Sequence, residues 1–141
     1  QEAELSMRRR LGASEGDLLV VQGNLAGTYN QLGRHEEALS IKRDVYFGCL
    51  RLNGEEHEAT IIEALNYAMT LASLQRFEEA RSLLRRIIPV ARRGLGENND
   101  ITLRVKFTYA LALYNDTGAT LDDLRESVAT LEETERTARR V

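Results

Sequence analysis

Apolar residues recur along this chain at the three- and four-residue spacing of amphipathic α-helices, with short polar turns between them. One set of predicted helices carries the stripes Val21/Leu25/Tyr29/Leu32, Ala64/Ala68/Leu71/Leu74 and Val105/Tyr109/Leu113. The alternate set carries Ile41/Val45/Cys49/Leu52, Leu84/Ile87/Ile88/Ala91 and Leu124/Val128/Leu131. The pattern therefore predicts an all-α chain built from helix pairs.

Polar residues mark where these helices begin and end. Asp17, Thr60 and Asp100 stand where an N-cap would satisfy unpaired amides of the first helix in each pair. The second helices open with Glu36-Glu37, Glu78-Glu79 or Asp122-Asp123, acids suited to the positive end of a helix dipole. Arginines crowd the last turns, where the negative helix end favours them without any ligand.

The helix pairs repeat. Residues 12–53 aligned with 54–95 without gaps share 12 identities in 42 positions, and Gly12, Gly54 and Gly96 keep the same spacing. The third unit continues this alignment and then slips by two residues near Gly118. We expect repeats at 12–53, 54–95 and 96–141, with residues 1–11 forming the end of the second helix of an earlier repeat. An array that begins within a repeat is expected to belong to something larger.

Three positions qualify the packing of the second helices. Ala38 and Ala80 lie one turn in, where a close helix approach excludes larger side chains. Leu124 takes that place in the third unit, so its helix pair should be splayed or packed differently. Pro89 removes a backbone hydrogen bond to Arg85 and should bend its helix.

The repeated text resembles the tetratricopeptide repeat, in the 42-residue form of kinesin light chains. The matching stretches are Gly54-Glu55-Glu56-His57-Glu58-Ala59-Thr60, Ala64-Leu65-Asn66-Tyr67-Ala68 and Leu74-Gln75-Arg76-Phe77-Glu78-Glu79-Ala80, with equivalents in the other units. The proline that the family has after the histidine is absent from all three units. The resemblance implies a right-handed α-solenoid of antiparallel helix pairs whose first helices line a concave groove.

The composition and net charge of the chain argue against several classes of function. The 141 residues carry a net charge of −3, which argues against a nucleic-acid surface, and no apolar run approaches the roughly 18 residues of a membrane span. A single cysteine, Cys49, excludes a disulfide framework and fits a cytoplasmic location.

Few residues that could perform chemistry converge. His35 has no second histidine four residues on, and His57 lies in a loop between repeats, so both are interpreted as structural or solvated. Cys49 lies on an apolar stripe and is interpreted as a packing thiol. The recurring acid pairs mark helix starts rather than a catalytic dyad. No enzyme, cofactor or metal site is therefore expected.

Gly23 and Gly27 leave two interpretations open. Their four-residue spacing is typical of a tight contact between helices, but it equally provides room for a ligand.

The resemblance also defines candidate groove residues. Those expected to face the groove are Val20, Asn24, Gly27, Asn30 and Gln31 in the first unit, Ile62, Asn66, Met69 and Ser73 in the second, and Arg104, Thr108, Leu111 and Asn115 in the third. Asn24, Asn66 and Thr108 recur at 42-residue spacing and form a ladder that could hydrogen-bond the main chain of an extended peptide. In the alternative interpretation these side chains cap or bridge neighbouring helices. Because Arg104 is the only basic residue of the set, a clamp for a terminal carboxylate is disfavoured.

The favoured function is a non-enzymatic scaffold that binds a peptide or protein segment in its groove. Two alternatives stay open: a spacer or self-association segment of a larger protein, which could self-associate through its uncapped ends, and a regulatory arm of a signalling enzyme.

Overall fold

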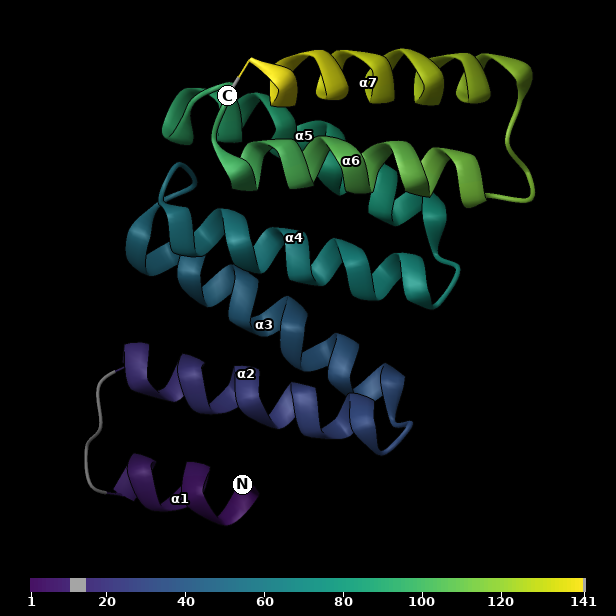
Figure 1. The fold of residues 1–141 in the computed structure, drawn as a ribbon. Coiled ribbons are helices and arrows are strands. Elements are labelled where there is room, and N and C mark those ends of the chain that lie inside the picture. Colours follow the sequence, from purple (N-terminus) through teal and green to yellow (C-terminus); the bar gives the residue numbers. More distant parts are fainter. Residues whose placement is uncertain (11–14, 141) are drawn as a thin grey trace. The chain divides into compact units, whose positions relative to one another are not determined.

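The computed structural model describes residues 1–10 and 15–140, and every regular element in these ranges is an α-helix. The helices are α1 (Glu2–Arg10), α2 (Glu15–Gln31), α3 (His35–Asn53), α4 (Glu58–Ser73), α5 (Phe77–Leu95), α6 (Asp100–Asn115) and α7 (Leu121–Arg139) (Figure 1). They form two compact units, Gln1–Gly54 and Glu55–Val141. The all-α prediction is confirmed, whereas Gly12 lies outside the described residues and the proposed repeat boundaries stay a prediction.

The first unit consists of α1, α2 and α3. Leu25, Tyr29 and Ala38 form one cluster of its core, against which Ile41 packs. Arg34 lies over the Tyr29 ring at 4.4 Å and pairs with Glu37, whose carboxyl pKa it lowers through a hydrogen bond. The hydroxyl of Tyr29 donates to a carboxylate of α1, and this hydrogen bond raises its pKa. Tyr29 thus joins all three helices.

The second unit is a run of four helices in which each packs on the next, and α4 also contacts α6. Figure 1 shows α4 and α6 side by side, with α7 on the other side of α6. Ala80 is fully buried beside Leu84 and Ile87, as its small size and the apolar stripe predict. The helix α5 continues past Pro89. The bend expected at this proline stays a prediction.

The turns before α3 and α5 use the same backbone conformation with different residues. Gly33 has φ 76° and its equivalent Gln75 has φ 61°, both in the left-handed region. Glycine enters that region freely, whereas glutamine does so at a cost of about 1 kcal/mol. Gln75 therefore occupies a strained position beside both cavities described below.

The predicted N-caps are wrong by one to three residues. Asp17 and Thr60 lie inside the first turns of α2 and α4, and Asp100 is the first residue of α6. His57 and Asn99 are the caps: their side chains accept hydrogen bonds from the amides of Ala59 and Ile101, at 3.1 and 2.8 Å. His57 and Asn99, 42 residues apart, thus both act as N-caps, which confirms a structural role for His57.

The prediction that the stripe Leu124/Val128/Leu131 of α7 is buried is also wrong. Leu124 and Val128 are 36% and 55% exposed, and the buried residues of α7 are instead Ser127, Thr134 and Thr137. Ser127 Oγ donates to the carbonyl of Ala110 on α6 at 2.9 Å. The third helix pair is therefore packed differently, as Leu124 led us to expect, but through polar contacts rather than a splayed apolar one.

A buried lysine anchors that polar interface. Lys106 of α6 is 1% exposed, and its Nζ contacts Glu97 and reaches Glu133 of α7 at 3.2 Å. The same two carboxylates pair with Arg92, at 2.9 and 3.2 Å. Lys106, followed by Arg92, lowers the pKa of Glu97. The buried charge is thus compensated, as such a charge must be in a stable fold.

Candidate functional site

A cavity of about 860 Å³ opens on the α4–α6 face of the second unit. We call it the α4–α6 groove. It is lined by Met69, Ala72, Ser73, Gln75, Phe77, Asp100, Leu103, Arg104, Phe107, Thr108, Leu111, Ala112, Asn115, Thr134 and Ala138. Burial sets its orientation: Val105, Tyr109 and Leu113 of α6 point into the core, so the opposite positions of that helix face outward.

Three large apolar side chains are exposed in this groove. Met69 is 43% exposed, Phe107 49% and Leu111 37%, with Leu103 and Phe77 half-buried beside them. Scattered apolar residues are normal on a protein surface, but three that share one concavity are typical of a binding site. The unbranched methionine can adapt to differently shaped ligands.

Polar groups surround these apolar residues. Ser73 and Thr108 donate their hydroxyls to carbonyls one turn back on their own helices, at 2.9 and 2.8 Å, so their oxygens can still accept from a ligand. Arg104 is exposed and makes no ion pair with any residue that the structure describes. The groove thus offers apolar contact flanked by donors, acceptors and one cation.

The structure brings together six of the thirteen predicted groove residues: Met69, Ser73, Arg104, Thr108, Leu111 and Asn115 line the groove. Asn66 is half-buried on α4, about one turn before Met69. It is not among the residues that line the groove. Ile62 is half-buried a further turn back on the same helix.

The remaining predicted residues lie on α2 of the first unit. Asn24 and Gln31 are exposed, and Val20 is 65% exposed. The Asn30 side chain contacts the His35 ring at 3.2 Å and so connects α2 to the first residue of α3. The Asn24–Asn66–Thr108 ladder spans both units and stays a prediction.

Sequence reasoning found Met69 and Leu111 but missed Leu103 and Phe107, which also line the groove. Leu103 and Phe107 lie four residues apart, and Leu111 follows after four more, which is a helical stripe distinct from the buried Val105/Tyr109/Leu113 stripe. Two apolar stripes on one helix were the available signal, because a helix buried on one side has no structural need of the second.

The two glycines of α2 do not form a tight contact. A Cβ atom added at Gly23 or Gly27 would meet nothing within 4 Å. Close approach occurs instead at Gly94, where a Cβ would lie 2.4 Å from the carbonyl oxygen of Glu56. The interpretation of Gly23 and Gly27 as a tight contact between helices is therefore wrong. The other interpretation, that they provide open space, agrees with the structure.

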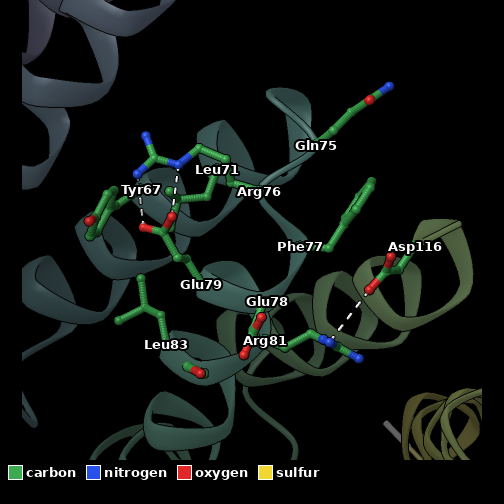
Figure 2. A pocket seen from close by; sticks show the side chains of 11 residues that line it. Tyr67, Leu71, Gln75, Arg76, Phe77, Glu78, Glu79, Arg81, Leu83 and Asp116 are labelled. Atoms are coloured by element: carbon green, nitrogen blue, oxygen red, sulfur yellow. Dashed lines mark hydrogen bonds and ion pairs between the residues drawn. The ribbon is translucent and has the colours of Figure 1, made fainter. Parts of the chain in front are cut away.

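A second cavity, of about 690 Å³, lies around the turn between α4 and α5, and Figure 2 shows its lining side chains. Four of its five charged side chains are paired with one another: Arg76 pairs with Glu79 at 2.9 Å, and Arg81 reaches Asp116 at 3.4 Å (Figure 2). Arg81 also reaches Asp123, at 3.3 Å. Hydrogen bonds from Thr120, with Arg81 nearby, lower the pKa of Asp123. These pairs tie α5 to the turn before α7, so we assign this cavity a structural role.

Other chemistry has little support in the structure. Cys49 is buried and, as the single cysteine of the sequence, forms no internal disulfide. Among residues 1–10 and 15–140, no cluster of three or more His, Cys, Asp and Glu side chains could hold a metal ion. None of the helices in these ranges is long and apolar enough to cross a bilayer.

A family model for the tetratricopeptide repeat matches residues 18–59 and 64–100, more than half of the chain. The chain belongs to the tetratricopeptide repeat family. The predicted family is therefore confirmed, and its members are generally protein–protein interaction modules. No curated protein matches the sequence.

Solved structures with the same fold are kinesin-light-chain-like. A putative kinesin light chain of Podosopora anserina with nearly identical TPR-like repeats superposes with a TM-score of 0.80 at 20% identity, over 96% of this chain and 63% of that one. BtubC (BKLC) of P. vanneervenii gives 0.77 at 17% identity, over 92% of this chain and 49% of that one. The chain thus spans less than two thirds of the length of either neighbour, and the likeness shows the α-solenoid fold of helix pairs predicted from the sequence.

Proposed function

We propose that this chain is a non-enzymatic interaction module that binds a peptide or protein segment in the α4–α6 groove. The observation that carries the proposal is the exposure of Met69, Phe107 and Leu111 within one concavity of about 860 Å³. A cavity of this size accommodates a few side chains of a peptide rather than a whole protein surface.

The apolar side chains would supply most of the affinity. Burying an exposed apolar side chain contributes roughly 1.5–3 kcal/mol when the burial is complete, so three partly exposed side chains support affinity in the micromolar range. Binding costs, including the ordering of the peptide, offset much of the gross gain. Phe107 lies between Leu103 and Leu111 on α6, and it is therefore the expected hot spot.

Polar groups would set the orientation of the ligand. Asn115, Thr108 and Ser73 can pair with a peptide main chain, and Arg104 provides one charge. In this proposal the asparagine ladder is secondary, because Asn66 is half-buried and does not line the groove. Substitution of Asn24 and Asn66 should therefore weaken binding less than loss of Phe107.

The remaining features agree with an adaptor. The net charge of −3 supports a protein partner rather than a nucleic acid, and the single buried cysteine, Cys49, supports a cytoplasmic location. A spacer whose groove stays empty is the competing function, and the experiment below separates the two.

The test is selection of a random peptide library on the 141-residue protein, followed by affinity measurement on variants. Phe107→Asp should weaken binding of the selected peptides by at least about a hundredfold, because it places a charge among apolar contacts. The matched control is Phe47→Asp, since Phe47 is 52% exposed on α3 and takes no part in the groove. The proposal fails if no peptide is enriched, or if Phe107→Asp binds the peptides as wild type does while its circular dichroism stays helical.

A further inference from the structure

The turn between α4 and α5 places a glutamine where glycine fits the backbone best. Gln75 has φ 61°, and among the described residues it is the one residue other than glycine with a positive φ. Gly33, 42 positions earlier, has φ 76° in the equivalent turn of the first unit. A Cβ atom at Gly33 would meet nothing within 4 Å, so glycine is favoured there by its backbone freedom and not by lack of space. Gln75 therefore carries a strain that the first unit avoids.

No polar contact of the Gln75 side chain compensates this strain. The side chain is exposed, and its carboxamide forms no hydrogen bond with any group that the structure describes. The backbone amide of Gln75 donates to the carbonyl of Ala72 at 3.0 Å, but a glycine would donate it equally well. Figure 2 shows the Gln75 side chain extending away from the Arg76–Glu79 pair. Strained residues cluster at ligand-binding sites, where the side chain has a use that the free protein does not show.

Gln75 lies at one end of the α4–α6 groove, among uncharged polar side chains. Ser73 ends α4, Asn115 ends α6, and both line the groove together with Gln75. The Asn115 carboxamide is also exposed and without a hydrogen-bond partner among the described residues. The charged lining residues, Asp100 and Arg104, belong to the opposite end of α6. This end of the groove thus presents two free carboxamides and one hydroxyl oxygen.

An extended main chain is the ligand chemistry that these carboxamides match. Each carboxamide donates through its nitrogen and accepts through its oxygen, and each peptide unit of an extended segment offers one donor and one acceptor. The backbone groups within a helical ligand are already paired with one another, so a helix would leave both carboxamides unsatisfied. A charged side chain of the ligand would find its partner at the other end of the groove, at Asp100 or Arg104.

We propose that Gln75 is a ligand-binding residue of the α4–α6 groove, whose carboxamide pairs with the main chain of an extended bound peptide. This role rests on the proposed function of the groove, and it names both the ligand group that is bound and a residue that binds it. A glycine at this position would relax the turn but would remove the hydrogen bonds to the ligand. The side chain of Gln75 thus lowers stability and raises affinity.

The variant Gln75→Gly tests both effects, with the peptides selected on the 141-residue protein as probes. The midpoint of thermal unfolding should rise by about 2–4 °C, because glycine enters the left-handed region freely. The affinity for the peptides should fall about tenfold, which corresponds to the loss of one or two hydrogen bonds. A protein that is more stable and binds more weakly is the expected result.

Two further variants separate the side chain from the backbone. Gln75→Ala removes the carboxamide and keeps a strained residue, so it should weaken binding as much as Gln75→Gly without raising the unfolding midpoint. Gly33→Gln is the matched control, since it makes the reverse exchange at the equivalent turn, outside the groove. It should lower the midpoint by about 2–4 °C and leave the affinity unchanged.

Replacing single amides of a selected peptide by esters tests the pairing with the main chain. An ester lacks the N–H donor, so at the position bound by Gln75 the exchange should weaken binding to wild type about fivefold. The same ester should weaken binding to Gln75→Gly by less than about twofold, because its partner is already absent. Equal losses in the two proteins at every position would overturn main-chain recognition by Gln75.

The outcomes distinguish this proposal from the proposed function. If Phe107→Asp abolishes binding while Gln75→Gly and Gln75→Ala bind as wild type does, the groove binds peptides but Gln75 takes no part. If no peptide is enriched, or if Phe107→Asp binds as wild type does, both proposals fail. A Gln75→Gly protein that is no more stable than wild type would refute the strain at this turn.

Discussion

The helices α5 and α7 are both the second members of helix pairs, and both contain 19 residues, yet they bury opposite kinds of surface. The helix α5 packs on α4 and α6 and buries Ala80, Leu84 and Ile87. Their counterparts 44 residues on, in the two-residue-shifted alignment, are Leu124, Val128 and Leu131, which face outward or are only half-buried. The helix α5 is apolar where α4 and α6 pack on it, whereas α7 is held on α6 by hydrogen bonds and on α5 by ion pairs.

The two interfaces also differ in what specifies them. Apolar packing between α5 and its neighbours depends on fit, so volume is the sensitive variable. The α6–α7 interface depends on paired charges and hydrogen bonds around Lys106, so the completeness of pairing is the sensitive variable. The comparison can be tested by making equivalent changes in both helices.

The largest effect is expected from a change of volume. Ala80→Trp should destabilise the protein by at least about 3 kcal/mol or prevent folding, because Ala80 is fully buried at a close helix crossing. Leu124→Trp introduces the same residue at the equivalent exposed position. It should alter the free energy of unfolding by less than about 1 kcal/mol. Urea unfolding followed by circular dichroism measures both. A cost below about 1 kcal/mol for Ala80→Trp would show that the alignment of the repeats is wrong.

A smaller effect is expected from removing charges around Lys106. The double variant Glu97→Gln/Glu133→Gln should lower the free energy of unfolding by about 2 kcal/mol, since a buried ammonium then lacks carboxylate partners. Lys106→Met should cost less than about 1 kcal/mol, because it replaces the buried charge with an apolar chain of similar length. Glu97 and Glu133, whose side chains are 44% and 46% exposed, stay solvated and keep Arg92.

The order of these two costs is the informative result in the same urea titrations. Equal costs would mean that Lys106 acts through its packing alone, and the proposed contrast between the two interfaces would not hold. A larger cost for Lys106→Met would reverse the contrast.

These contrasts show which parts of the structure the sequence can predict. The helix pairs and the outward side of α6 follow from spacing, because one stripe of each helix must be buried. The face of α7 did not follow, since Leu121/Leu124/Val128/Leu131 and Ser127/Thr134/Thr137 both have helical spacing, and the choice was made by Lys106 on another helix. The N-cap of α6 was predicted wrongly for a local reason. Asn99 and Asp100 are adjacent acceptors, and the preference for one over the other is small.

The candidate groove was predicted for its polar residues and for Met69 and Leu111, whereas Leu103 and Phe107 were missed. Arg104, Thr108 and Asn115 followed from the position of groove residues in the repeat family, and the structure places them together. Phe107 was missed because a single exposed aromatic residue is unremarkable in a sequence. Only the neighbouring Met69, which comes from a different helix, makes it part of a concavity.

The smallest expected effect sharpens the comparison through pH. Because Lys106 lowers the pKa of Glu97 below its ordinary 4.5, the pair stabilises the folded state above that pH and loses its contribution as the pH falls through the lowered value. The stability difference between wild type and Glu97→Gln should therefore be constant near neutrality and shrink below about pH 5. In a Lys106→Met background the same Glu97→Gln difference should vary less with pH, because the main cause of the shift is gone. Urea titrations of the four proteins at a series of pH values measure both differences, and an equal pH dependence in the two backgrounds would assign the shift of Glu97 to Arg92 rather than to the buried lysine.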